Sequence, residues 1–144
     1  MKDRTPENLR GRVSRAWASV PVTMIAVIAL AGCGSSKPSY CSSRTNLEHS
    51  VKNLPSAVSS SGISSLPSQV TTIKSDATTL VNDAKSDFRT QTSAVKSSVD
   101  TLATAVKALP SSPSASQIAA IGLDASNVVS SVKSFSDASK SKCS

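Results

Sequence analysis

The chain has 144 residues, of which 38% are hydrophobic and 3% aromatic, and its net charge is +7. This length suits one small domain and little more. Beyond the first 16 residues only Arg44 and Arg89 are arginines and the lysines are dispersed, so the basic balance lacks the cluster of cations and aromatics typical of nucleic-acid binding.

The first 32 residues have the pattern of an export signal. Five cations and two acids fall within residues 1–16, and residues 17–32 carry no charge, which matches the n-region and h-region of a signal peptide. The uncharged segment ends in Leu30-Ala31-Gly32 and is followed directly by Cys33. Residues 1–32 are therefore predicted to be a leader that is removed.

Two alternatives apply to this leader. A transmembrane helix needs about 20 apolar residues, whereas Pro21 and Thr23 interrupt a shorter stretch here. A plain secretory signal would be cleaved after Ala29-Leu30-Ala31. The cysteine at position 33 favours a third interpretation.

The arrangement resembles a bacterial lipoprotein precursor, with Leu-Ala-Gly-Cys as the lipobox. This resemblance implies that the Cys33 thiol carries diacylglycerol and acyl chains such as palmitate, and that the mature protein is held on the extracytoplasmic side of the cell membrane. The Ser/Thr-rich, Lys-containing composition resembles that of small helical envelope lipoproteins of actinobacteria. Apart from this covalent lipid we expect no cofactor.

Cysteine usage predicts one disulfide in the mature chain. If Cys33 is lipidated, Cys41 and Cys143 remain as an even pair in a compartment where disulfides persist. In the chain-entropy model, closing a loop of roughly 100 residues stabilises a fold by about 4–5 kcal/mol. Two free thiols or a metal pair are the alternatives, although the histidine and carboxylate neighbours of a closed metal site are missing.

After the lipidation site, residues 33–44 are rich in linker residues and are expected to form a flexible tether. A helix is predicted over residues 45–54, since Thr45 and Glu48 have the spacing of a capping box and Pro55 ends the pattern. Its apolar face consists of Leu47, Val51 and Leu54.

A long central helix is predicted over residues 65–109. Residues 68–109 contain neither glycine nor proline, and apolar residues follow one another there in steps of three and four. An eleven-residue repeat starts at Ile73, Ala84 and Val95, and this period favours a straight helix. A corner near residues 89–92 remains the alternative.

The last helix is predicted over residues 114–140. Pro110 and Pro113 force a turn before it, and Ser114 with Gln117 forms a second capping-box pattern. Together these elements predict an all-α fold: a three-helix antiparallel bundle, or coiled-coil hairpin, with a long central helix and with the disulfide joining the first helix to the last.

Catalytic patterns are sparse. His49 is the only histidine, and its position opposite the apolar face of residues 45–54 predicts a solvated surface residue. The aspartates lie among lysines at helical spacings, which indicates exposed i,i+4 pairs rather than a metal site. We therefore expect neither an enzyme nor a small-molecule substrate.

The remaining interpretation is a lipid-anchored, non-catalytic structural or protein-interaction module with an envelope protein as partner. The eleven-residue repeat forms a row of lysines, which we treat as the candidate partner surface: Lys74, Lys85, Lys96 and Lys107. The simpler alternative is that these lysines are solvated beside an apolar seam. A second function class is membrane-surface binding by the amphipathic repeat, and a third is a phage- or plasmid-type exclusion or immunity lipoprotein.

Overall fold

The computed structural model describes residues 36–59 and 62–144, and within them the chain forms helices and no strands. The helices are α1 Ser39–Lys52, α2 Leu54–Ala57, α3 Leu66–Ala84, α4 Arg89–Lys107 and α5 Ala115–Cys143. The predicted leader and Cys33 lie outside the described residues. For the rest of the chain, the all-α prediction is confirmed.

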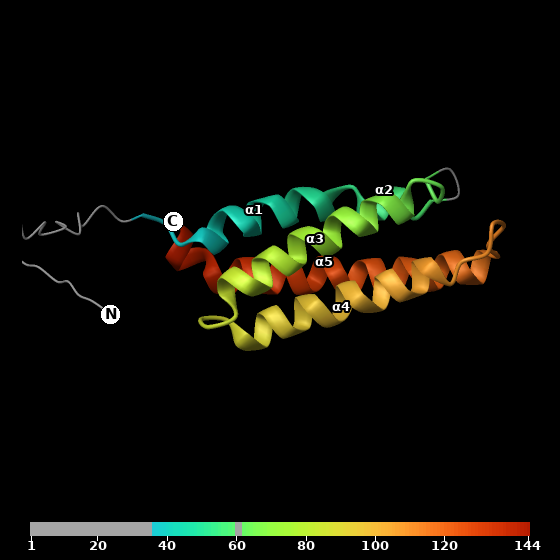
Figure 1. Ribbon diagram of the computed structural model, residues 1–144. Helices are drawn as coiled ribbons and strands as arrows, with labels where there is room; N and C mark the ends of the chain where they lie inside the picture. Colours follow the sequence, from blue (N-terminus) through green and yellow to red (C-terminus); the bar gives the residue numbers. More distant parts are fainter. Residues whose placement is uncertain (1–35, 60–61) are drawn as a thin grey trace, which may run out of the picture. The chain divides into compact units, whose positions relative to one another are not determined.

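The four long helices form an antiparallel bundle (Figure 1). Helix α1 packs on α3 and α5, and α4 packs on the same two helices, so that each long helix contacts two of the others. The short α2 follows α1 and also packs on α3 and α5. Each long helix therefore runs against the next one in the chain, the up-and-down topology that short connections favour.

The first helix begins earlier than predicted. Helix α1 starts at Ser39, so residues 39–44 are not part of a flexible tether, and it ends at Lys52 rather than at residue 54. The reason is that Tyr40, Cys41 and Ser43 are buried and extend the apolar face by almost two turns. Pro38 precedes the helix with φ −52° and ψ 147°, and its carbonyl accepts the amide of Cys41 at 2.9 Å.

The capping box predicted at Thr45 and Glu48 is wrong, because both residues lie inside the helix. Thr45 Oγ1 donates to the carbonyl of Cys41 one turn earlier, at 3.1 Å. Glu48 pairs with Arg44 at 3.5 Å instead of reaching back to a backbone amide. Pro55 fills the first turn of α2, where a missing amide hydrogen costs little.

The long central helix is also wrong, and the bundle has four long helices rather than three. The chain leaves the helical conformation at Phe88 (φ −134°, ψ 49°) and turns back between Ala84 and Arg89, just before the alternative corner. At about 1.5 Å per residue, the 29 residues of α5 span roughly 44 Å. A continuous helix over residues 65–109 would therefore have extended well past its partner and left apolar residues uncovered.

The last helix follows its prediction closely. Ser114 Oγ accepts the amide of Gln117 at 3.3 Å, and Gln117 Oε1 accepts the amide of Ser114 at 2.8 Å, so this capping box is confirmed. The helix continues three residues beyond the predicted end, to Cys143.

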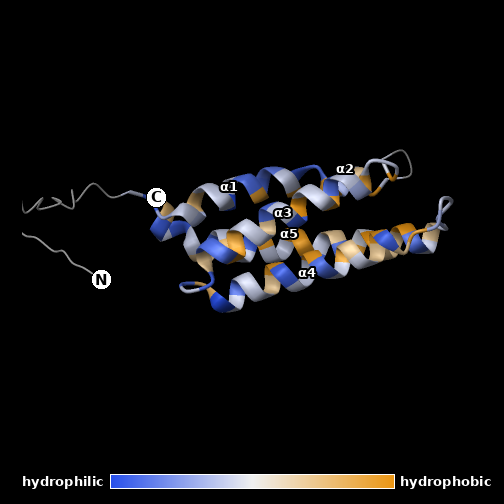
Figure 2. Cartoon of the chain, in the orientation of Figure 1, coloured by the Kyte–Doolittle hydropathy of each residue, from blue (hydrophilic) through white to orange (hydrophobic). Residues whose placement is uncertain are grey.

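The core consists mainly of the apolar residues that the helical spacing predicts. Figure 2 shows apolar and polar positions alternating along the long helices. The apolar residues of α3 that follow one another in steps of three and four form a seam, and all of them are buried: Leu66, Val70, Ile73, Ala77, Leu80 and Ala84. Beyond the turn, Thr92, Val95, Val99 and Leu102 are buried as well. The apolar pattern that continues through residues 66–102 is thus divided between two antiparallel helices, and both halves pack into the same core.

Two partly buried hydrogen bonds join α1 to α3 at the edge of this core. Ser43 Oγ donates to Asp83 Oδ2 at 2.5 Å, and Ser50 Oγ donates to Asp76 Oδ2. Ser50 lies seven residues after Ser43, and Asp76 lies seven residues before Asp83. The two bonds can therefore form together in only one antiparallel register of α1 and α3. The prediction of exposed i,i+4 pairs is wrong for these two aspartates but confirmed for Lys96–Asp100 and Lys133–Asp137.

Candidate interaction surface

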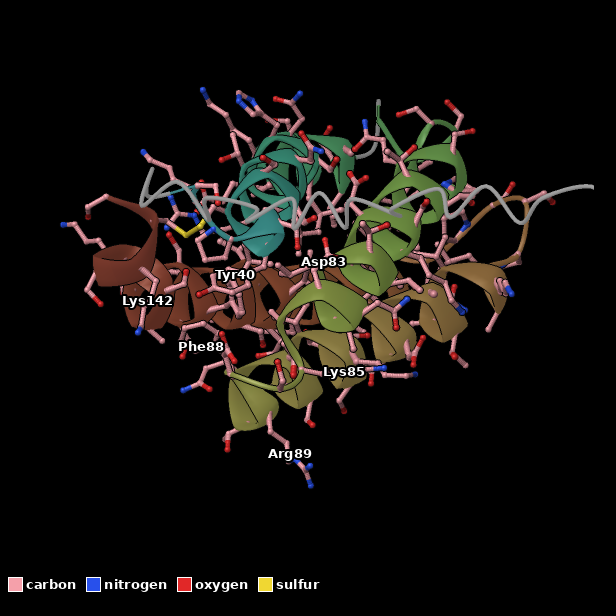
Figure 3. All side chains as sticks on the ribbon, turned by 60° about the vertical axis from the view of Figure 1, so that its left-hand side comes forward. Tyr40, Asp83, Lys85, Phe88, Arg89 and Lys142 are labelled. Atoms are coloured by element: carbon pink, nitrogen blue, oxygen red, sulfur yellow. A yellow bond between two sulfur atoms is a disulfide. The ribbon has the colours of Figure 1, made fainter. Side chains whose placement is uncertain are left out.

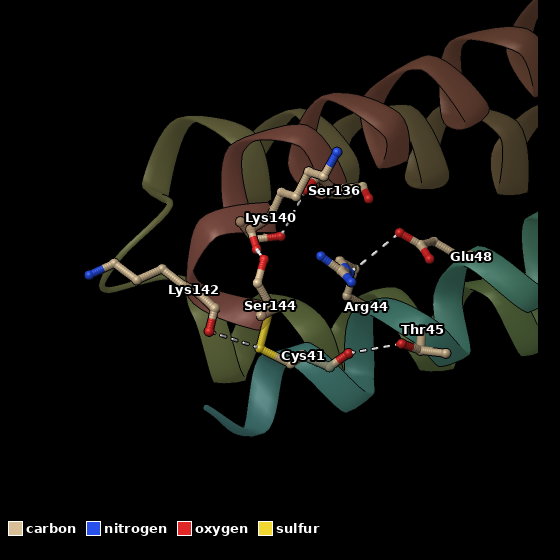
Figure 4. The surroundings of a disulfide bond; sticks show 10 residues. Cys41, Arg44, Thr45, Glu48, Ser136, Lys140, Lys142 and Ser144 are labelled. Carbon is tan, nitrogen blue, oxygen red and sulfur yellow. Dashed lines mark hydrogen bonds and ion pairs between the residues drawn. A yellow bond between two sulfur atoms is a disulfide. The ribbon is translucent and has the colours of Figure 1, made fainter. Parts of the chain in front are cut away.

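The predicted disulfide is present. Cys41 and Cys143 are bonded with their Cα atoms 5.5 Å apart, and the bond joins the start of α1 to the end of α5 (Figure 4). The Cys41 sulfur also lies 3.9 Å from the carbonyl oxygen of Lys142. The two ends of the folded region are thereby fixed side by side.

Three aromatic rings pack beside the disulfide. Tyr40, Phe88 and Phe135 make mutual edge-to-face contacts with ring centroids 5.3–6.4 Å apart, an arrangement that stabilises beyond simple burial. Burial raises the pKa of Tyr40, and the Asp87 carboxylate raises it further. This cluster was not predicted, although Tyr40 lies seven residues before Leu47 and so continues the apolar face of α1.

The turn at Phe88 divides the predicted lysine row. Lys74 lies on α3, Lys96 and Lys107 lie on α4, and Lys85 follows the last residue of α3 at the end where the chain turns. A single straight row is therefore wrong, because it required one continuous helix. Three of the four lysines nevertheless come together along one groove.

This α3/α4 groove is a hollow of about 470 Å³ between the two helices. Small apolar side chains form its floor, including one buried alanine from each helix, and longer polar side chains form its rim. The floor includes Ala77, Val81, Val99 and Ala103, and the rim includes Lys74, Lys96, Lys107 and Asp100. A second hollow of about 480 Å³ shares Lys74, Ala103 and Lys107 and extends the groove toward Leu109.

A single carboxylate links the two sides of the groove. Asp100 Oδ1 lies 3.4 Å from Lys74 Nζ on α3, and Asp100 Oδ2 accepts from Lys96 Nζ at 2.5 Å. The hydrogen bond from Lys96 lowers the pKa of Asp100 most, and Lys74 adds to this lowering. Lys107 also lines the groove, and with three lysines to one aspartate the rim carries a net positive charge. Asp100 was missed as a groove residue, since its position opposite Lys74 depends on a turn that was considered only as the alternative to one continuous helix.

The other predicted residue lies elsewhere. His49 is exposed on α1, as expected, and does not line the groove. Within residues 36–59 and 62–144, no three His, Cys, Asp or Glu side chains group in a way that could hold a metal ion. The groove offers an apolar floor and cationic hydrogen-bond donors, which suit binding.

No helix in the described part of the chain is both long and apolar enough to span a membrane. Comparisons with protein-family models, with curated proteins and with solved structures found no match.

Proposed function

We propose that the chain is a lipid-anchored protein of the cell envelope, attached through Cys33, whose helical bundle is a non-catalytic protein-interaction module. The sequence pattern that ends at Cys33 supports the anchor and the extracytoplasmic location. Cys33 precedes the start of α1 by six residues, so a lipid on this cysteine would keep the bundle close to the membrane.

The α3/α4 groove is the observation that carries the interaction part of the proposal. An apolar floor between two helices accepts the apolar face of a third helix. Lysines on the rim would pair with acidic residues that flank such a face, and they would disfavour a basic partner. The proposed partner is therefore an envelope protein that offers an amphipathic helix with acidic flanks.

A zero-length carbodiimide cross-linker tests this proposal on intact cells, because it joins a lysine directly to a carboxylate. We expect intermolecular links from Lys107 to acidic residues of one envelope protein, identified by mass spectrometry of the purified conjugate. Thr78→Trp should abolish these links, since Thr78 lines the groove and indole would fill it.

Thr79→Trp is the matched control. Thr78 and Thr79 are adjacent and exposed, and each donates a hydrogen bond to the carbonyl four residues earlier, but Thr79 does not line the groove. This variant should retain the links. Equal loss of the links in both variants, or links that map only to α1 and α5, would show that the groove does not bind the partner.

A further inference from the structure

Three segments that are distant in the sequence meet at the end of the bundle where the disulfide lies. They are the start of α1, the turn between α3 and α4, and the end of α5 (Figure 1). The Cys41–Cys143 bond joins the first segment to the third, and the Tyr40–Phe88 ring contact at 5.4 Å joins the first to the second. We call this region the disulfide end.

Each of these segments contributes exposed cations to the disulfide end. The five cations are Lys37, Lys85, Arg89, Lys140 and Lys142. Figure 3 turns this end toward the viewer and shows Lys85, Arg89 and Lys142 placed around Tyr40 and Phe88. The exposed acids in the same segments are Asp87, whose carboxylate interacts with Tyr40, and Asp137, which pairs with Lys133. The side chains of this end therefore carry a clear positive excess.

The opposite end of the bundle, which we call the loop end, has no such charge. It comprises residues 53–59 and 62–73, which include the start of α3, and residues 108–123, which include the connection to α5. None of these residues is an Asp, Glu, Lys, Arg or His, and the nearest cations in the chain are Lys52, Lys74 and Lys107. Charged side chains are thus missing from these stretches of the loop end, whereas five exposed cations gather at the disulfide end.

The disulfide end is also where the chain enters from Cys33. Six residues span at most about 20 Å when fully extended. Clusters of Lys and Arg this close to an anionic leaflet are attracted to it, each contributing to membrane affinity within about a Debye length, roughly 8 Å at physiological salt. None of the five cations lines the α3/α4 groove, so they are available to a second ligand.

We propose that the disulfide end is a docking face for anionic phospholipid headgroups, so that the bundle stands on the membrane with its loop end outward. In the cell this arrangement rests on the proposed anchor at Cys33. The headgroup contact itself needs neither the anchor nor a protein partner and can be measured without them.

The test uses residues 33–144 with Cys33→Ser and the disulfide intact, because the chain from Ser35 onward forms a compact unit of its own. Sedimentation with vesicles should show binding to phosphatidylcholine bilayers that contain phosphatidylglycerol, weakening as salt is added. Pure phosphatidylcholine vesicles should bind little. Equal binding to both vesicles would overturn the proposal.

Two variants that remove equal charge locate the contact. The end variant carries Lys85→Gln, Arg89→Gln, Lys140→Gln and Lys142→Gln. The flank variant carries Lys52→Gln, Lys74→Gln, Lys96→Gln and Lys107→Gln. At about fivefold per cation, the end variant should bind at least about a hundredfold more weakly, and the flank variant should change less than about threefold. Equal loss in both, or a larger loss in the flank variant, would mean that the flank lies on the membrane and would overturn the proposal.

Tryptophan quenching by brominated lipids measures the orientation directly. The only tryptophan is Trp17, within the leader, so Ser141→Trp at the disulfide end and Ser112→Trp at the loop end each introduce a single fluorophore. Quenching of Trp only in the Ser141→Trp protein supports the proposal, and stronger quenching in the Ser112→Trp protein contradicts it. The groove proposal can fail separately, because the flank variant removes the groove lysines and the end variant leaves them in place.

Discussion

The disulfide end and the loop end of the bundle are held together by different means. At the disulfide end, a covalent bond and three aromatic rings join α1, the α3–α4 turn and α5. At the loop end, the packing is aliphatic, with Leu54 and Leu66 fully buried and Leu123 left 70% exposed.

This difference shows that a chain with few aromatic residues can concentrate its strongest contacts at one end of the bundle. Residues 33–144 contain only three aromatics, and all three meet beside the disulfide. That end also carries five exposed cations, and α1 starts there, six residues after Cys33. We infer that stability is concentrated where the protein would meet the membrane, and the following predictions test this contrast.

Removing the disulfide should have the largest effect. Cys41→Ser with Cys143→Ser opens a loop with a sequence separation of 102 residues, and the chain-entropy model predicts a loss of about 4–5 kcal/mol in the free energy of unfolding. Urea unfolding of the residue 33–144 protein, followed by circular dichroism, measures it. An unchanged midpoint in the double variant would show that the bond adds nothing to the disulfide end.

The aromatic cluster should matter more than any exposed apolar residue. Phe135 is fully buried between Tyr40 and Phe88, so Phe135→Ala should lower the free energy of unfolding by about 3–5 kcal/mol. Leu123→Ala at the loop end should change it by no more than about 0.5 kcal/mol. Similar losses for the two variants would refute the contrast between the ends.

Removing the hydrogen bond between Ser43 and Asp83 should have a smaller effect on stability. Ser43→Ala removes the donor to Asp83 and should cost about 1.5–3 kcal/mol, the usual range for a hydrogen bond to a charged group. Ser42→Ala, one residue earlier and exposed, is the control and should be nearly neutral. Chemical denaturation of both proteins checks this, and equal stabilities would mean that the Ser43–Asp83 bond does not stabilise the bundle.

The smallest effects are expected from two glycines at the loop end. An added Cβ at Gly122 would lie 3.8 Å from Val58 Cγ1, an ordinary contact, so Gly122→Ala should raise stability by about 1 kcal/mol through helix propensity. A Cβ at Gly62 would lie only 2.7 Å from the Ala57 carbonyl oxygen. Gly62→Ala should therefore lower stability by about 1 kcal/mol or more. Thermal melts distinguish the two signs, and a destabilising Gly122→Ala would contradict the packing described for this end.

Most core positions could be predicted from the sequence, because helical spacing places apolar residues on one face wherever the helix happens to end. The seam from Leu66 to Ala84, the capping box at Ser114 and the Cys41–Cys143 pair are examples. The turn at Phe88 could not be predicted in the same way. It contains neither glycine nor proline, and the step of four residues from Ala84 to Phe88 continues the helical pattern without a break.

The groove depended on that turn and was therefore predicted only in part. The eleven-residue repeat singled out Lys74, Lys96 and Lys107, which line the groove, but it placed them on one helix and grouped them with Lys85. Their actual arrangement follows from the antiparallel pairing of α3 and α4, which brings Asp100 opposite Lys74. This pairing depends on how α3 packs on α4, and the periodicity of the sequence does not specify that packing.

Intact-mass spectrometry of the protein isolated from its native membrane fraction would show whether Cys33 is the lipid anchor. We expect a chain that starts at Cys33, carries the mass of a diacylglycerol-based modification on that residue, and gains two hydrogens when the Cys41–Cys143 bond is reduced. A chain that retains residues 1–32, or an unmodified Cys33, would contradict it.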